Sequence, residues 1–94
     1  MKGVLVQAFV LIQMRNGSPS IGAALRAIPG VESSDDLTGP FDAIALVSAG
    51  TMRELFDSVL TRIQALPGVV RALPAPLVRA GSGLILQPKP AAAA

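Results

Sequence analysis

The residues best suited to chemistry lie in one short segment, Thr38-Gly39-Pro40-Phe41-Asp42. A tight turn at Gly39-Pro40 would present backbone N–H groups, one aromatic ring and one carboxylate at the end of a sheet. Because N–H groups donate to anionic oxygens and a carboxylate accepts from cations, this set could bind a small polar molecule. The simpler interpretation is a β-turn in which Asp42 accepts local N–H bonds, and the sequence alone leaves both interpretations open.

Few other residues favour catalysis. The chain has no Cys and no His, which removes thiolate chemistry, disulfides and the commonest general base and metal ligand. Asp35 and Asp36 are adjacent, so in a strand they point to opposite faces, and no third metal ligand is evident. Lys2 and Lys89 lie at the ends of the chain. We therefore expect no enzyme activity, no metal site and no cofactor.

The charge pattern and the aromatic content argue against nucleic acid as a partner. The net charge is +2, the eight basic residues are spread along the chain, and Trp and Tyr are absent. The apolar run Val4–Met14 resembles a leader peptide, but Gln7 and Gln13 interrupt it and it is too short to span a membrane. The run therefore predicts a buried strand in a cytoplasmic protein.

An internal repeat organises the chain. The sequence Ala-Ile-Pro-Gly-Val at 27–31 returns as Ala-Leu-Pro-Gly-Val at 65–69. A residue that precedes proline is disfavoured in the helical region, so one helix should end near Ile28 and another near Leu66. Gly30 and Gly68 then permit a sharp turn into the next strand.

Each predicted helix also has a start signal. Ser18 is expected to be the N-cap of the first helix, with Pro19 at its first position. Thr51 and Glu54 form a T-x-x-E capping box for the second helix. The apolar residues that follow recur at helical spacing, which indicates one buried face on each helix. These stripes are Ile21, Ala24, Leu25 and Ile28 in the first helix, and Met52, Leu55, Phe56, Val59, Ile63 and Leu66 in the second.

The order of elements predicts an α+β fold of the ferredoxin-like type, βαββαβ. Right-handed crossovers place both helices on one face of a four-stranded antiparallel sheet, in which the first and third strands are central. The predicted strands are Val4–Met14, Val31–Thr38, Asp42–Ala49 and Val69–Val78.

The remaining two strands suit the edges of the sheet. The second strand is polar, which discourages unwanted pairing, and the fourth carries Pro74 and Pro76, which lack an N–H group. We expect residues 1–78 to form the domain. Residues 79–94 are predicted to be an extension, partly disordered or docked on a neighbour.

Both faces of the two central strands are apolar, yet the helices can cover only one of them. Large exposed apolar patches usually mark interfaces, so we expect a second copy to cover the other face in a sheet-to-sheet dimer. An alternative is that residues 79–94 fold back over this face. The expected dimer interface consists of Phe9, Leu11, Ile44 and Leu46.

The segment T-G-P-F-D-A-I-A-L-V, followed by a capped helix and I-Q-A-L-P-G-V, resembles the effector-binding (RAM) domain of Lrp/AsnC transcriptional regulators. The resemblance spans roughly Val4–Val78. Regulators of this family carry an N-terminal helix-turn-helix domain, whereas this chain begins at the first strand of the effector domain. It therefore resembles a stand-alone form, and direct binding to DNA is not expected.

The resemblance implies a dimeric αβ sandwich or barrel whose dimers assemble into rings of four or five, an octamer or a decamer. It also implies an amino acid or related small metabolite bound between dimers, with full-length Lrp/AsnC regulators as possible partners. Asp42 would meet the ligand's ammonium group, hairpin N–H groups its carboxylate, and Met52 and Leu77 its side chain. The implied effector-binding residues are Gly39, Phe41, Asp42, Met52, Ala75, Pro76 and Leu77.

Two other functions share this topology. A dimeric αβ-barrel enzyme would need a pocket that usually contains His, Tyr or Trp, none of which is present. A regulatory subunit of the ACT type would need a partner enzyme. A structural oligomer without a ligand is the third possibility, so the leading prediction is a non-catalytic sensor in transcriptional or metabolic regulation.

Overall fold

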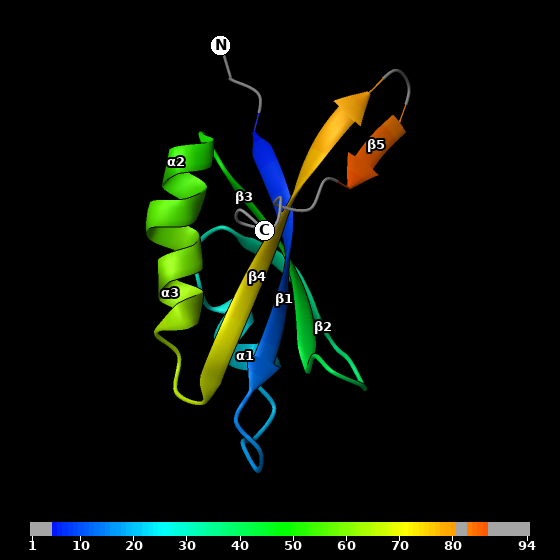
Figure 1. The fold of residues 1–94 in the computed structure, drawn as a ribbon. Coiled ribbons are helices and arrows are strands. Elements are labelled where there is room, and N and C mark those ends of the chain that lie inside the picture. Colours follow the sequence, from blue (N-terminus) through cyan, green and yellow to red (C-terminus); the bar gives the residue numbers. More distant parts are fainter. Residues whose placement is uncertain (1–4, 81–82, 87–94) are drawn as a thin grey trace, which may run out of the picture.

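The computed structural model describes residues 5–80 and 83–86 of the chain. Two helical regions pack against one antiparallel sheet, as predicted (Figure 1). The second helical region is continuous and consists of α2, η1 and α3. The elements are β1 (Val6–Met14), α1 (Gly22–Arg26), β2 (Val31–Asp36), β3 (Ala43–Ala49), α2 (Met52–Glu54), η1 (Leu55–Leu60), α3 (Thr61–Gln64), β4 (Val69–Ala80) and β5 (Gly83–Leu86).

The sheet has the order β2-β3-β1-β4-β5. Strands β1 and β3 are central and β2 is an edge, which confirms the predicted ferredoxin-like arrangement. Strand β4 differs from the prediction because it continues to Ala80 and forms a hairpin with β5, from Leu77 to Leu86 (Figure 1). The predicted domain boundary after residue 78 therefore falls inside a strand. Residues 81–82 and 87–94 of the expected extension lie outside the described residues.

The two copies of the internal repeat form the same turn, as their sequences predict. The Val31 N–H group donates to the Ile28 carbonyl oxygen at 3.1 Å, and Gly30 has a φ of 101°. Gly68 has a φ of 90°, and the equivalent bond closes the turn from residue 69 to residue 66 at 3.2 Å. Proline at the second position and a positive-φ glycine at the third define a type II turn. The Pro-Gly sequence is therefore sufficient to determine the turn that joins each helix to the following strand.

The start of the first helix is not where the sequence predicts it. Helix α1 begins at Gly22 and its N-cap is Ile21, without a side-chain cap, so the prediction of Ser18 as N-cap is wrong. Ser18 belongs to a turn in which its N–H group donates to the Arg15 carbonyl oxygen at 3.0 Å. Its hydroxyl packs so closely against Gly68 that a Cβ there would lie 2.8 Å from it. Ser18 therefore lies three residues before the N-cap, in contact with a distant part of the chain.

The predicted capping box is present at the start of α2. The Glu54 N–H group donates to Thr51 Oγ1 at 3.0 Å. The Glu54 carboxylate accepts from the Gly50 N–H group at 3.1 Å, one residue earlier than in the usual reciprocal pair. Both bonds satisfy N–H groups that a helix start would otherwise leave unpaired.

The middle of the second helical region is wound as a π-helix, η1, which the sequence did not predict. The Thr61 hydroxyl donates to the Phe56 carbonyl oxygen five residues earlier, at 3.2 Å. Leu60 is buried although it lay outside the predicted stripe, and its spacing of four residues from Phe56 and three from Ile63 places it beside that stripe. Met52, a member of that stripe, is instead exposed.

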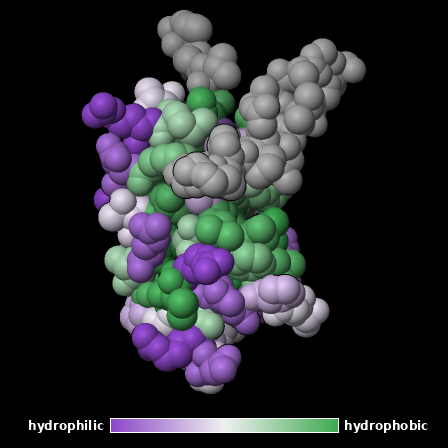
Figure 2. Space-filling view, in the orientation of Figure 1, coloured by the Kyte–Doolittle hydropathy of each residue, from purple (hydrophilic) through white to green (hydrophobic). Residues whose placement is uncertain are grey.

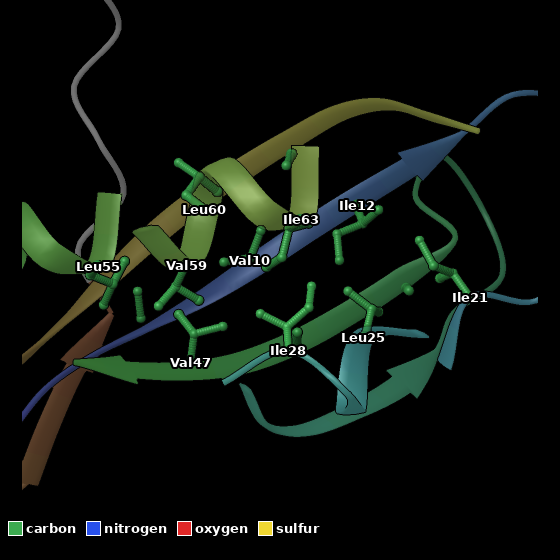
Figure 3. Packing of buried hydrophobic residues seen from close by; sticks show 14 of the residues in the cluster. Val10, Ile12, Ile21, Leu25, Ile28, Val47, Leu55, Val59, Leu60 and Ile63 are labelled. Atoms are coloured by element: carbon green, nitrogen blue, oxygen red, sulfur yellow. The ribbon is translucent and has the colours of Figure 1, made fainter. Parts of the chain in front are cut away.

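The core lies between the sheet and the helices (Figure 3). Alternate residues of the central strands point into it, and Figure 3 shows the helix residues meeting them from the other side. Of the stripe predicted for the first helix, Leu25 in α1 and Ile21 and Ile28 beside its two ends are buried as predicted, while Ala24 is exposed. The central contacts come from Val10, Ile12, Val47, Leu55, Val59 and Ile63.

Candidate effector site and subunit interface

The hairpin between β2 and β3 is held at the end of the central strands. The Leu37 N–H group donates to the Asp42 carbonyl oxygen, and the Asp42 N–H group donates to the Ile12 carbonyl oxygen, both at 2.8 Å. Gly39 has a φ of 117°, so the tip of the hairpin needs glycine. The turn of Gly39, Phe41 and Asp42 is thereby fixed against β1.

The Asp42 side chain has a structural role of its own. Its Oδ2 atom accepts from the Met14 N–H group at 2.7 Å, which ties the end of β1 to the start of β3. The bond joins residues 28 positions apart, so it is not the local turn bond that the sequence suggested. The other oxygen, Oδ1, has no hydrogen-bond partner among the described residues. Asp42 can therefore hold the hairpin and still accept from a bound cation.

A hollow of about 260 Å³ opens beside Asp42. Its wall is the loop from Met14 to Ile21, and Asp36 and Leu37 complete it. Arg15 and Asp36 were not predicted as site residues, because no sequence motif connects the loop after β1 with the end of β2. The hollow combines one guanidinium group and two carboxylates, so its polarity suits a small charged molecule.

Met52 lies at the opposite end of the sheet from Asp42, whereas Ala75 and Pro76 pair with β1 near the middle of the sheet. Met52 follows the last residue of β3, whereas Asp42 precedes the first. Strand β3 has seven residues, so the two ends are about 20 Å apart. Within one chain, no amino acid could contact both Asp42 and Met52.

The three predicted residues of β4 do not share one face. Ala75 pairs with Phe9 and Pro76 pairs with Ala8, so Ala75 lies on the face away from the helices and Pro76 on the helix side. By the same alternation Leu77 belongs to the face of Ala75. Because Pro76 also lacks an N–H group, its backbone can accept a hydrogen bond from a ligand but cannot donate one.

The two carboxylates of the acidic pair in β2 point to opposite faces, as the sequence suggested. Asp35 pairs with Ile44 and Asp36 with Ala43, so the two carboxylates occupy opposite faces. Among the described residues no group of three or more acidic, His or Cys side chains is placed to hold a metal ion. In the same part of the chain, no helix has the length and apolar character to cross a membrane.

The face of the sheet away from the helices, here called the open face, has an apolar centre. Phe9 pairs with Leu46 and Leu11 pairs with Ile44, and all four side chains are half-buried. Leu73 extends this centre onto β4 and is 39% exposed. Figure 2 shows hydrophobic side chains gathered over the middle of the sheet.

Polar groups surround that centre on the described part of the open face. Gln7 donates to the Glu32 carboxylate at 3.3 Å, and Gln13 donates to the Pro40 carbonyl oxygen at 3.3 Å. An apolar centre with a polar rim is the usual anatomy of a protein–protein interface. The four residues predicted for the dimer interface thus lie together on one exposed surface.

These features are those of a ferredoxin-like α+β subunit with a fixed glycine-aspartate hairpin and an open sheet face. The family model described as Lrp/AsnC ligand binding domain matches residues 7–72. The chain belongs to the Lrp/AsnC ligand-binding-domain family. Domains of this family are regulatory ligand-sensing modules and not catalytic ones.

Solved structures agree with this assignment. A protein from Thermus thermophilus, TTHA0845, is 38% identical, with a TM-score of 0.70 over 81% of this chain and 96% of that one. FFRP-DM1 is 23% identical, with a TM-score of 0.70 over 78% of this chain and 99% of that one. MtbAldR is 20% identical, with a TM-score of 0.68 over 83% of this chain but only 56% of that one. Because their identities are low, the last two structures support the fold alone. A comparison with curated protein sequences found no significant match.

Proposed function

We propose that this protein is an amino-acid-sensing subunit that acts in transcriptional or metabolic regulation, in the cytoplasm. The subunit pairs through its open face, and the dimers assemble into a ring of octamer or decamer size, alone or with full-length Lrp/AsnC regulators. The effector is an amino acid or a related small metabolite that binds between dimers. Effector binding then favours the assembled ring by mass action, because the ligand contacts two dimers at once.

The observation that carries this proposal is the separation of the two halves of the predicted site. The hairpin with Asp42 and the helix start with Met52 lie at opposite ends of β3, about 20 Å apart in one chain. A ligand the size of an amino acid can contact both halves only if they come from different subunits. Assembly would therefore complete the site.

The hairpin half suits the ammonium and carboxylate groups of an amino acid, and the other half suits its side chain. Oδ1 of Asp42 is available to accept from an ammonium group, since only Oδ2 is bonded to Met14. The N–H groups of Gly39 and Phe41 make no hydrogen bond within the described residues and can donate to a carboxylate. Met52 and Leu77 offer apolar contacts for the side chain, which favours an aliphatic amino acid.

A complementation experiment tests whether the two halves come from different subunits. Asp42→Asn removes the charge of one half, and Met52→Asp introduces charge into the other at an exposed first helical position, where an acid is tolerated. Each variant alone should lose amino-acid binding in calorimetry. Mixed rings, prepared by refolding the two variants together, should recover about a quarter of the sites. Asp57→Asn, an exposed acid on η1, is the control and should keep all of them.

Other outcomes identify the competing functions. A mixture that recovers no binding would contradict a site shared between subunits. Native mass spectrometry with a panel of amino acids should show a change of assembly state on binding. An oligomer indifferent to every amino acid would instead favour a structural role, and co-purification of an enzyme would favour an ACT-type regulatory subunit.

A further inference from the structure

The chain contains a single asparagine, Asn16, and the residue after it is Gly17. Both residues are exposed in the loop that follows β1, which projects beyond the end of that strand (Figure 1). Asparagine is one of the thermally labile residues of proteins, because the next backbone nitrogen can attack its side-chain amide. Glycine in the next position favours this attack, since it has no side chain to obstruct the ring that forms. Among the amides of this chain, the Asn16 side chain is therefore the best placed to react.

The structure leaves the attacking nitrogen accessible. The Gly17 N–H group makes no hydrogen bond within the described residues, and a Cβ at Gly17 would meet no atom within 4 Å. Within the described loop one hydrogen bond spans the turn, from the Ser18 N–H group to the Arg15 carbonyl oxygen at 3.0 Å. Because this single bond lies in an exposed loop, the turn can open locally and allow the Asn16 side chain to approach the nitrogen.

Both ends of this turn are held against the second repeat turn. The Arg15 N–H group donates to the Gly68 carbonyl oxygen at 2.7 Å, and the Ser18 hydroxyl packs closely against Gly68. Residues 16–17 are thus the free tip of a loop whose two ends are fixed. A change in the length of the backbone at the tip would strain both of these contacts.

We infer that Asn16-Gly17 is a site of spontaneous deamidation in the folded protein. The Gly17 nitrogen gives up its proton and bonds to Cγ of Asn16, and the amide nitrogen leaves with a proton as ammonia. Water then opens the resulting succinimide at one of its two carbonyl groups, which gives aspartate or isoaspartate. The reaction consumes only water. Because Asn16 lines the hollow beside Asp42, each product adds a negative charge there.

The two products have different effects on the turn. Aspartate keeps the original path of the backbone. Isoaspartate carries the backbone through the former side chain of residue 16 and lengthens it by one methylene group. Because Arg15 and Ser18 are both held against Gly68, the longer backbone should weaken their contacts and lower the stability of the domain.

Ageing of the purified full chain tests the inference. The protein is kept at neutral and at mildly alkaline pH, and its intact mass, the released ammonia and the isoaspartate content are followed. One ammonia should be released per chain, faster at the higher pH because the Gly17 nitrogen must lose its proton. The rate should be about two- to tenfold below that of a synthetic peptide of residues 13–20, because opening the turn breaks one exposed hydrogen bond.

Three variants serve as controls. Asn16→Gln keeps an amide in the loop, but its ring would need one more atom, so it should release no ammonia over the same period. Gly17→Ala should react more slowly than wild type, because its methyl group obstructs the attack. Freshly purified Asn16→Asp represents the aspartate product alone. Aged wild-type protein should unfold at a lower urea concentration than this variant, since only isoaspartate lengthens the backbone.

Each contrary result has a distinct meaning. A folded chain that keeps its amide about 100 times longer than the peptide would overturn the inference, because the fold would then protect Asn16. Equal release of ammonia from Asn16→Gln would assign the reaction to another amide and would also overturn it. Aged protein that contains isoaspartate but unfolds like fresh protein would overturn the predicted effect on the turn. None of these results depends on the proposed sensing of amino acids.

Discussion

Asp42 combines a structural and a ligand-binding role, and substitutions can separate the two. Asp42→Ala removes the acceptor of the Met14 N–H group, a charge-assisted bond of 2.7 Å. Because Asp42 is exposed, water competes for this bond, and we expect a loss of about 1–2 kcal/mol in the free energy of unfolding. In a domain of this size that loss lowers the melting temperature by roughly 5–10 °C. Asp42→Asn keeps a neutral acceptor and should lose less than about 1 kcal/mol.

Ligand binding should respond differently from stability. Both Asp42 variants remove the carboxylate charge that faces the ligand's ammonium group, so both should raise the amino-acid dissociation constant by about 10- to 100-fold. The assays are thermal unfolding followed by circular dichroism at fixed protein concentration, and calorimetric titration of each variant. Asp36→Asn is the control, because this carboxylate lines the same hollow without a hydrogen bond to the backbone.

Two results would refute this reasoning. If Asp42→Asn kept wild-type affinity, the carboxylate would not bind the ammonium group and Asp42 would serve only to fix the hairpin. If Asp36→Asn lost binding to the same extent as Asp42→Asn, the ligand would occupy the hollow within one subunit, and not a site between dimers.

Three further predictions concern the fold and the interface. Gly30→Ala should cost about 2–5 kcal/mol in unfolding free energy, because a Cβ there would lie 2.7 Å from Val59. Gly17 has a φ of 84° but nothing within 4 Å of such a Cβ, so Gly17→Ala should cost only about 1–2 kcal/mol. Equal losses of the two variants in urea denaturation would contradict this difference. Thr51→Ala should cost about 1 kcal/mol by loss of the N-cap, and Thr51→Ser almost nothing, as measured by thermal unfolding. Leu11→Asp should weaken the dimer at least about 100-fold in sedimentation while the helical circular dichroism is retained, and an unchanged dimer would exclude the open face as the interface.

Features that depend on neighbours along the chain could be predicted from the amino-acid sequence. Proline and glycine at 29–30 and 67–68 fix two type II turns, because the first residue restricts φ and the second accepts a positive φ. The Thr51–Glu54 cap is likewise local, since both hydrogen bonds span four residues or fewer. The order of elements with right-handed crossovers predicted the order of the first four strands, and the apolar residues of the central strands predicted the open face, whereas β5 was not predicted.

Features that depend on contacts between segments far apart in the sequence could not be predicted, because tertiary packing decides them. Ser18 lies in a turn after β1 and close to Gly68, and α1 begins only at Gly22. Leu60 is buried and Met52, the first residue of α2, is exposed, because which residues at the ends and margins of the stripe reach the core depends on how the helix lies on the sheet.

The candidate site also has one part that the sequence predicted and another that only the fold shows. The sequence identified the Gly39–Asp42 hairpin, but only the fold shows that Asp42 bonds to Met14 and that Met52 lies at the far end of β3. Residue types and local spacing carry no information about which strand ends meet, because that depends on the registers of β1, β3 and β4. The hairpin was therefore predictable as a motif, whereas its separation from the rest of the site followed from the pairing of the strands.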